Sequence, residues 1–202
     1  MKIYDLTPAQ KNIDDMQRFY SGSAISVLCG AVIFDEKLDA KLLIRAAKLV
    51  IMRQEALRLR FCIENGRTMQ YISPEGGDKI ALAEFRNEDE MRSYCRSQAK
   101  QPFSGEGEMF RMTVFTLPDK TGIMLCASHL IADAWTYSIL AHGVYTVYGQ
   151  ISRGEEAELV VQNFSSAIER RLGEKALEKR SNDLRFWEEK YSGGAFPTPV
   201  RT

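Results

Sequence analysis

Residues 122–135 read GIMLCASHLIADAW, in which an apolar run is followed by a histidine and then by an aspartate. The run Gly122–Ala127 predicts a strand, because continuous apolar segments of this length are typical of buried strands. Asp133 is a good helix-capping residue. The segment after it has apolar residues at helical spacing: Trp135, Ile139, Leu140, Val144 and Val147. His129 therefore falls between a strand and a helix, where α/β folds place reactive groups.

The segments on the N-terminal side of this stretch predict alternating helices and strands. Thr7, Pro8 and Gln10 together indicate a helix start, and the helix should run to about Tyr20. Residues 24–34 are β-branched and apolar, which predicts a strand buried on both faces. Asp39 should cap the next helix, whose apolar stripe comprises Leu42, Leu43, Ala46, Leu49 and Val50. Strands over residues 57–64 and 68–73 should form a hairpin at Asn65-Gly66.

The second half of the chain continues this alternation. A helix is expected from Asn87 to about Lys100, followed by a strand over residues 109–117. Residues 161–191 are helical in pattern and heavily charged, with a break near Gly173. The Gly/Pro-rich residues 192–199 are typical of a linker. Helices interleaved with hairpin strands favour the α/β class, as an α+β two-layer sandwich with a mixed, partly antiparallel sheet.

Length and composition describe an ordinary globular domain. The 202 residues are 45% hydrophobic and 27% charged, which excludes disordered and coiled-coil classes. Twenty-seven basic and 27 acidic residues cancel, so neither nucleic acid nor an anionic membrane is an expected partner. No apolar run approaches the about 20 residues that cross a bilayer, and the N-terminus lacks a signal-peptide core. A cytoplasmic location is expected.

The four cysteines, Cys29, Cys62, Cys95 and Cys126, form no close pairs in the sequence. Zinc sites need closely spaced ligands, and disulfide scaffolds are shorter and richer in cysteine. Four reduced thiols packed as small hydrophobic side chains are therefore expected, with no metal site.

The chain has only two histidines, so a histidine mechanism has few candidates. His142 lies in the middle of a predicted helix and is expected to be structural or exposed to solvent. For His129 we consider four interpretations: a Cys126–His129 nucleophilic pair, a metal site with Cys126 and Asp133, a structural histidine held by Asp133, and a general base or positioning group. A strand would direct Cys126 and His129 to opposite faces, and further metal ligands are lacking. Spacing alone does not separate the last two interpretations.

Several motifs of the chain resemble those of nonribosomal peptide synthetase condensation domains. Residues 128–135, SHLIADAW, resemble the H-H-x-x-x-D-G-W motif, and residues 6–10, LTPAQ, resemble the opening L-S-x-A-Q. Residues 52–61, MRQEALRLRF, resemble R-H-E-x-L-R-T-x-F, and residues 101–111 resemble P-F-D-L…P-L-F-R. Phe186-Trp187 before Ser192-Gly193 resembles the Y-W…L-x-G that closes the N-terminal lobe. The resemblance covers essentially the whole chain.

This resemblance implies a lobe of the chloramphenicol-acetyltransferase-like fold, with residues 1–191 as the N-terminal lobe and 192–202 as the start of the interlobe linker. The activity implied is that of an acyl or peptidyl transferase, which joins two carrier-bound thioester substrates by an amide bond. His129 is implied as the catalytic residue. Asp133 is implied to pair with Arg58 or, failing that, with Arg53, and thereby to hold the loop.

The resemblance also implies partners. Substrates would arrive on the phosphopantetheine of peptidyl carrier proteins, and no cofactor would be bound directly. The active site of the family lies between two lobes, so an isolated N-terminal lobe is expected to be inactive. The face turned toward the missing C-terminal lobe should be apolar and should promote dimerisation.

Two positions depart from the family motif. Ser128 replaces its first histidine, and Ala134 replaces its glycine and adds a Cβ. These departures leave two alternatives open: a catalytically degenerate module that binds a carrier protein or tailoring enzyme, and a related coenzyme A-dependent acyltransferase.

Overall fold

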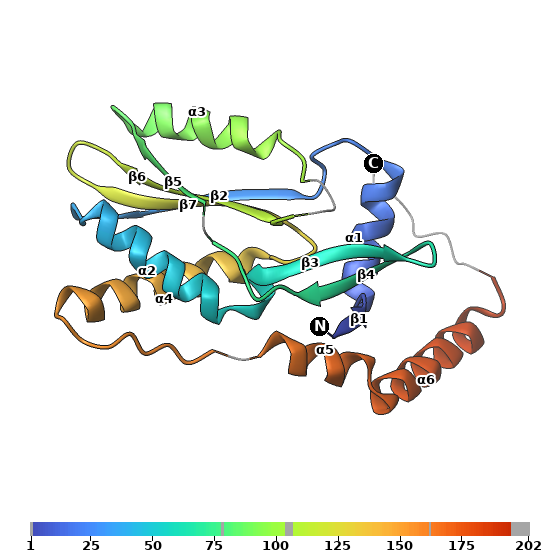
Figure 1. Ribbon diagram of the computed structural model, residues 1–202. Helices are drawn as coiled ribbons and strands as arrows, with labels where there is room; N and C mark the ends of the chain where they lie inside the picture. The colour runs from blue at the N-terminus through green and yellow to red at the C-terminus, as the bar shows by residue number, and fades with distance from the viewer. Residues whose placement is uncertain (1, 78, 104–106, 162, 195–202) are drawn as a thin grey trace. The chain divides into compact units, whose positions relative to one another are not determined.

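The computed structural model describes residues 2–77, 79–103, 107–161 and 163–194. The chain divides into two compact units, Met1–Ser165 and Ser166–Thr202. The strands of the first unit form a four-stranded and a three-stranded sheet (Figure 1).

The four-stranded sheet carries the histidine loop. Its order is β2 (Val27–Phe34), β7 (Thr121–Ser128), β6 (Phe110–Thr116) and β5 (Ile80–Glu84). β5 and β6 are parallel, whereas the other pairs are antiparallel. The expected mixed, partly antiparallel sheet is confirmed.

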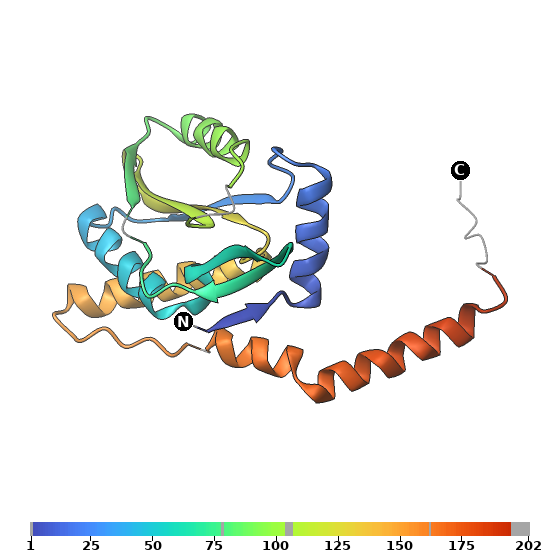
Figure 2. The ribbon, with the colours of Figure 1, turned by 45° about the vertical axis from the view of Figure 1, so that its right-hand side comes forward.

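Helices cover both faces of this sheet (Figure 2). On one face, α2 (Ala40–Arg53) and α4 (Ala134–Ser152) pack against each other and contribute to the larger core with β6 and β7. On the other face, α3 (Glu88–Ala99) covers a smaller core. The α/β class is confirmed. The sheet has helices on both faces, so the fold has three layers in place of the two expected.

The three-stranded sheet has the order β1 (Ile3–Asp5), β4 (Arg67–Ile72) and β3 (Leu59–Glu64), and the short 3-10 helix η1 (Glu55–Arg58) leads into β3. Asn65 and Gly66 have φ angles of 49° and 75°. Positive φ at both positions suits a tight hairpin turn, so the predicted hairpin is confirmed.

Local start signals place the first helix correctly, whereas two strands were not expected. α1 (Pro8–Phe19) begins after Thr7 with the predicted capping box. β1 and β5 are too short to show a strong alternation of apolar and polar residues. β5 also follows a glycine-rich segment, which is more typical of a loop. The predicted burial of β2 on both faces is wrong, because β2 is an edge strand whose residues are mostly half-buried.

The predicted break at Gly173 is confirmed, since it separates α5 (Phe164–Leu172) from α6 (Glu174–Tyr191). Within α6, Lys179 pairs with Asp183 at 2.7 Å, and the Trp187 and Tyr191 rings stack. Of the expected linker over residues 192–202, the part beyond Gly194 lies outside the described residues. Over the described residues, no helix combines the length and apolar character needed to cross a membrane.

The expectation of four reduced thiols is wrong for two cysteines. Cys29 of β2 and Cys126 of β7 form a disulfide, and they lie directly opposite each other in the strand register with a Cα–Cα distance of 4.1 Å. Cys62 and Cys95 are free. The Cys95 sulfur lies 3.4 Å from that of Cys29, and burial raises the pKa of the Cys95 thiol.

Candidate functional site

The candidate site is the turn between β7 and α4. β7 is buried along its whole length and ends at Ser128, so the chain emerges from the core at His129. α4 begins after Asp133, whose carboxylate accepts the Thr136 N–H at 3.0 Å. The Thr136 hydroxyl in turn accepts the Asp133 N–H at 3.0 Å, which completes a capping box.

Backbone hydrogen bonds fix both ends of the turn. The Ser128 N–H donates to the Met109 carbonyl at 2.8 Å, and the His129 N–H donates to the Ser26 carbonyl at 2.8 Å. Ser128, which replaces a histidine of the family motif, is fully buried, and its hydroxyl accepts the Leu130 N–H at 3.3 Å. The serine therefore supports the turn from within.

The His129 side chain is exposed on a loop between a strand and a helix, as predicted. Its Nδ1 lies 2.8 Å from the Ala132 carbonyl oxygen. Because a carbonyl oxygen only accepts, Nδ1 carries the hydrogen of this bond, and Nε2 of the neutral ring keeps its lone pair. Among the residues that the structure describes, Nε2 has no hydrogen-bond partner, so this basic nitrogen is available to a substrate.

The predicted ion pair between Asp133 and an arginine is not formed. Asp133 is exposed, and in the described part of the chain its carboxylate bonds only to Thr136. Arg58 donates instead to the Ser73 carbonyl, and the Arg58 carbonyl accepts the Ser73 N–H at 2.9 Å. Arg53 is exposed at the end of α2. Asp133 acts here as a helix cap, and Arg58 joins η1 to the end of β4.

Ala134, the second departure from the motif, is the first residue of α4 and is exposed. A Cβ is compatible with this helical position, so the replacement of glycine does not disturb the start of α4. His142 is also exposed, farther along the same helix.

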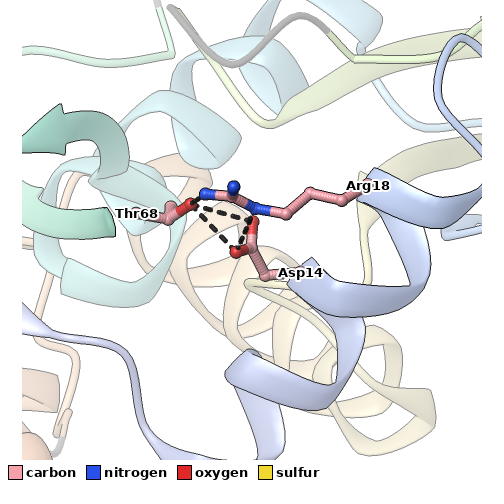
Figure 3. A network of polar contacts seen from close by, with 3 residues as sticks. All are labelled: Asp14, Arg18 and Thr68. Atoms are coloured by element: carbon pink, nitrogen blue, oxygen red, sulfur yellow. Dashed lines mark hydrogen bonds and ion pairs between the residues drawn. The ribbon is translucent and has the colours of Figure 1, made fainter. Parts of the chain in front are cut away.

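A groove of about 1310 Å³ lies beside the histidine loop. Leu130 and Met109 line one side of it, and Phe61 and Tyr71 contribute from β3 and β4. A polar part of the lining comes from α1 and β4, where Asp14, Arg18 and Thr68 form a connected network (Figure 3).

This polar network joins α1 to β4 at the groove. Arg18 Nε lies 2.9 Å from Asp14 Oδ2, and the Arg18 guanidinium also donates to the Thr68 hydroxyl at 2.6 Å. The Thr68 hydroxyl donates to the Asp14 carboxylate at 2.9 Å. The Asp14 carboxylate is therefore paired with Arg18 and Thr68 and does not present an unpaired negative charge to the groove.

Large apolar side chains are exposed near the histidine turn. Trp135 and Ile139 of α4 are 74% and 57% exposed, and Ile25, next to the Ser26 that anchors His129, is 47% exposed. Exposure of such side chains is costly in water and favours a covering surface.

Some contributors to the turn were missed by sequence reasoning. The anchors Ser26 and Met109 act through backbone carbonyls, which leave no side-chain signal. Gln10 was expected only as a capping residue, yet its amide also donates to the Leu130 carbonyl at 3.0 Å. In the part of the chain that the structure describes, no group of three or more His, Cys, Asp or Glu side chains is placed to hold a metal ion.

Comparison with protein families supports the resemblance. The family model described as Condensation domain matches residues 1–199. Surfactin synthase subunit 1 of Bacillus subtilis (strain 168) is 30% identical over 201 residues, which cover 94% of this chain and 6% of the relative. Tyrocidine synthase 3 of Brevibacillus parabrevis is 30% identical over 158 residues, with 77% and 2% covered.

Solved structures confirm the fold. The starter condensation domain of rhizomide synthetase RzmA aligns with a TM-score of 0.87 at 17% identity, covering 98% of this chain and 50% of that one. The condensation domain from Monacolin K polyketide synthase MokA gives 0.81 at 19% identity, with 100% and 45% covered. The chain thus spans about half of these solved chains, and a few per cent of the curated relatives.

Proposed function

The chain belongs to the condensation-domain family, and on this premise we propose that residues 1–191 are the N-terminal lobe of a nonribosomal peptide synthetase condensation domain. Residues 192–202 would begin the linker to a C-terminal lobe. The observation that carries the proposal is the exposed His129, whose Nδ1 is hydrogen-bonded to Ala132 O and whose Nε2 has no partner among the described residues.

The proposed reaction forms an amide bond between two thioester substrates. The amine of an aminoacyl thioester attacks the carbonyl carbon of an acyl or peptidyl thioester, and the C–S bond of the latter breaks to release a thiol. His129 Nε2 either accepts the proton that the amine loses or holds the amine in line for attack. The proton ends on the released thiolate or in solvent, so no further reactant is required.

The neighbours of His129 are proposed to support the loop rather than to react. Ser128 holds the Leu130 amide, and Asp133 caps α4. Ala134 begins the helix, and neither Arg58 nor Arg53 makes a hydrogen bond or ion pair with the loop among the described residues. Of the residues named from the motifs, only His129 is proposed to touch the substrate.

The proposed partners are two peptidyl carrier proteins and the C-terminal lobe. The carriers would present both substrates on phosphopantetheine, so no cofactor would be bound directly. The C-terminal lobe would cover Trp135, Ile139 and Ile25, and a copy of the chain could substitute for it and form a dimer. The proposed location is the cytoplasm, and a lobe without its partner is proposed to be inactive.

The test uses the complete protein with both carrier proteins loaded. His129→Ala should lower the rate of amide formation by about 10²–10⁴-fold, as loss of a general base does. His142→Ala is the matched control, because it removes the other histidine from an exposed position of α4 and should leave the rate unchanged.

The donors used in this assay separate the alternatives. Turnover with an acyl-coenzyme A but not with an acylated carrier would favour a coenzyme A-dependent acyltransferase. Carrier binding without turnover of the unaltered protein would favour a degenerate binding module. An unchanged rate in His129→Ala would overturn the proposed role of this residue.

A further inference from the structure

Two glutamine side chains form a buried amide pair behind the histidine turn. Gln10 of α1 is 6% exposed and Gln70 of β4 is fully buried. Gln10 Nε2 donates to Gln70 Oε1 at 2.8 Å, and Gln70 Nε2 donates back to Gln10 Oε1 at 2.9 Å. Buried polar groups need hydrogen-bond partners, so the partners of this pair indicate its role.

The second N–H of each amide shows which segments the pair connects. Gln10 Nε2 also donates to the Leu130 carbonyl at 3.0 Å, and Gln70 Nε2 donates to the Asp5 carbonyl at 2.9 Å. Carbonyl oxygens only accept, so both amide groups have a fixed orientation. The pair therefore connects β1, α1 and β4 to Leu130, the residue after His129.

Helix capping does not explain this arrangement. The capping box of α1 uses Gln10 Oε1, which accepts the Thr7 N–H and the Thr7 hydroxyl, both at 3.0 Å. The donation to Leu130 comes from the other end of the same amide. A residue needed only as a cap would not require Gln70 or Leu130 as partners.

We infer that Gln10 and Gln70 are positioning residues for His129. By holding the Leu130 carbonyl, they fix the turn whose later residue, Ala132, accepts the hydrogen bond from His129 Nδ1. Gln10 acts directly on the turn, and Gln70 orients Gln10. This inference rests on the proposed function of His129, since a held imidazole matters only if the ring acts on a substrate.

The tautomer of His129 provides a readout that does not require activity. While Nδ1 donates to Ala132 O, the neutral ring has its hydrogen on Nδ1. If the turn is released, this bond weakens and the Nε2–H tautomer, which is favoured by a free imidazole, becomes populated. The ¹⁵N shifts of the imidazole nitrogens in the neutral state report the two forms directly.

The decisive variant is Gln10→Met, which keeps the length of the side chain and removes every hydrogen bond of the amide. Thr7→Val is the matched control, because it removes the capping hydroxyl of the same helix end but leaves the Leu130 bond in place. In the 202-residue chain, Gln10→Met should raise the Nε2–H fraction of His129 several-fold, whereas Thr7→Val should not. A folded Gln10→Met protein with the tautomer of the parent chain would overturn the inference.

A second variant covers failure of Gln10→Met to fold. Gln10→Asn keeps a polar amide at the buried position, but its amide is one methylene short of Leu130 O. It should produce the same tautomer change to a smaller extent. An Asn variant that folds with an unchanged tautomer would overturn the inference equally.

Kinetics of the complete protein separate positioning from substrate binding. Gln10→Met should lower kcat about tenfold with KM little changed, because misplacement of a reacting group affects the chemical step. Thr7→Val should retain the kcat of the parent. If the tautomer changes as expected but His129→Ala retains full activity, positioning stands and the proposed function fails. If His129→Ala is inactive but Gln10→Met leaves the tautomer of His129 unchanged, the proposed function stands and the positioning role of Gln10 fails.

Discussion

Strands β2 and β7 pair along their whole length, yet they have different surroundings. Every residue of β7 is buried, because β2 and β6 flank it and helices cover both faces. β2 has the more apolar sequence, VLCGAVIF, but it forms the edge of the sheet and is mostly half-buried. Apolar composition therefore identifies a strand, whereas the number of neighbouring strands determines how deeply it is buried.

The two strands also contribute differently to the candidate site. β7 runs directly into the turn that carries His129, so its position sets where the histidine emerges. The β2 side supplies the backbone carbonyl of Ser26, just before the strand begins. We therefore expect β2 to tolerate changes of side chain that β7 does not.

The largest effect should come from the bond that joins the two strands. Reduction of the Cys29–Cys126 disulfide should lower the free energy of unfolding by about 4 kcal/mol, because the bond links residues 97 positions apart in the chain. Urea unfolding of oxidised and reduced protein measures this loss. Thiol titration of the denatured chain should find Cys62 and Cys95 before reduction and all four cysteines after it. Four reactive thiols in untreated protein would contradict the cross-link.

Leucine truncations test the difference in burial. Leu125→Ala in β7 should cost about 3 kcal/mol, because a 2% exposed side chain leaves a cavity in the core. Leu28→Ala in β2 should cost about 1 kcal/mol, since its half-buried side chain leaves a site that solvent reaches. Urea unfolding of both variants gives the comparison, and equal losses would show that β2 is buried as deeply as β7.

Glycine substitutions test the same difference in available space. A Cβ at Gly122 of β7 would lie 2.6 Å from the Val32 carbonyl oxygen and would clash with the Phe115 ring. A Cβ at Gly30 of β2 would lie 3.1 Å from the edge of the Tyr137 ring. We expect Gly122→Ala to cost about 2 kcal/mol and Gly30→Ala less than about 1 kcal/mol. Thermal unfolding of the two variants checks the order, and the reverse order would refute this account of the packing.

Features set by local spacing were predictable from the sequence. The capping box at Thr7, the hairpin at Asn65-Gly66 and the strand–turn–helix around His129 each depend on residues a few positions apart. Short-range hydrogen bonds and backbone preferences determine such features, so a single sequence contains their signals.

Features set by contacts between distant segments were not predictable in the same way. The edge position of β2 and the pairing of Cys29 with Cys126 depend on strand order, which periodicity does not encode. The predicted Arg58–Asp133 ion pair was wrong, because the Arg58 guanidinium donates to the carbonyl of Ser73, at the end of the adjacent strand. Gln10 has a local signal only as a helix cap, since its bond to Leu130 spans 120 positions.

The smallest effect is expected where the chain leaves β7 and reaches solvent. Asp133→Ala should cost about 1 kcal/mol, because the variant loses an exposed helix cap but leaves no charge uncompensated. Asp133→Asn should cost less, since an asparagine oxygen caps a helix about as well as an aspartate oxygen. His129→Ala should also be nearly neutral, because the ring is exposed. Urea unfolding of the three variants decides between a cap and a buried ion pair. A loss of about 3–5 kcal/mol in Asp133→Ala would instead require a buried, oppositely charged partner for the carboxylate. The turn would then be as buried as β7, and the contrast between them would fail.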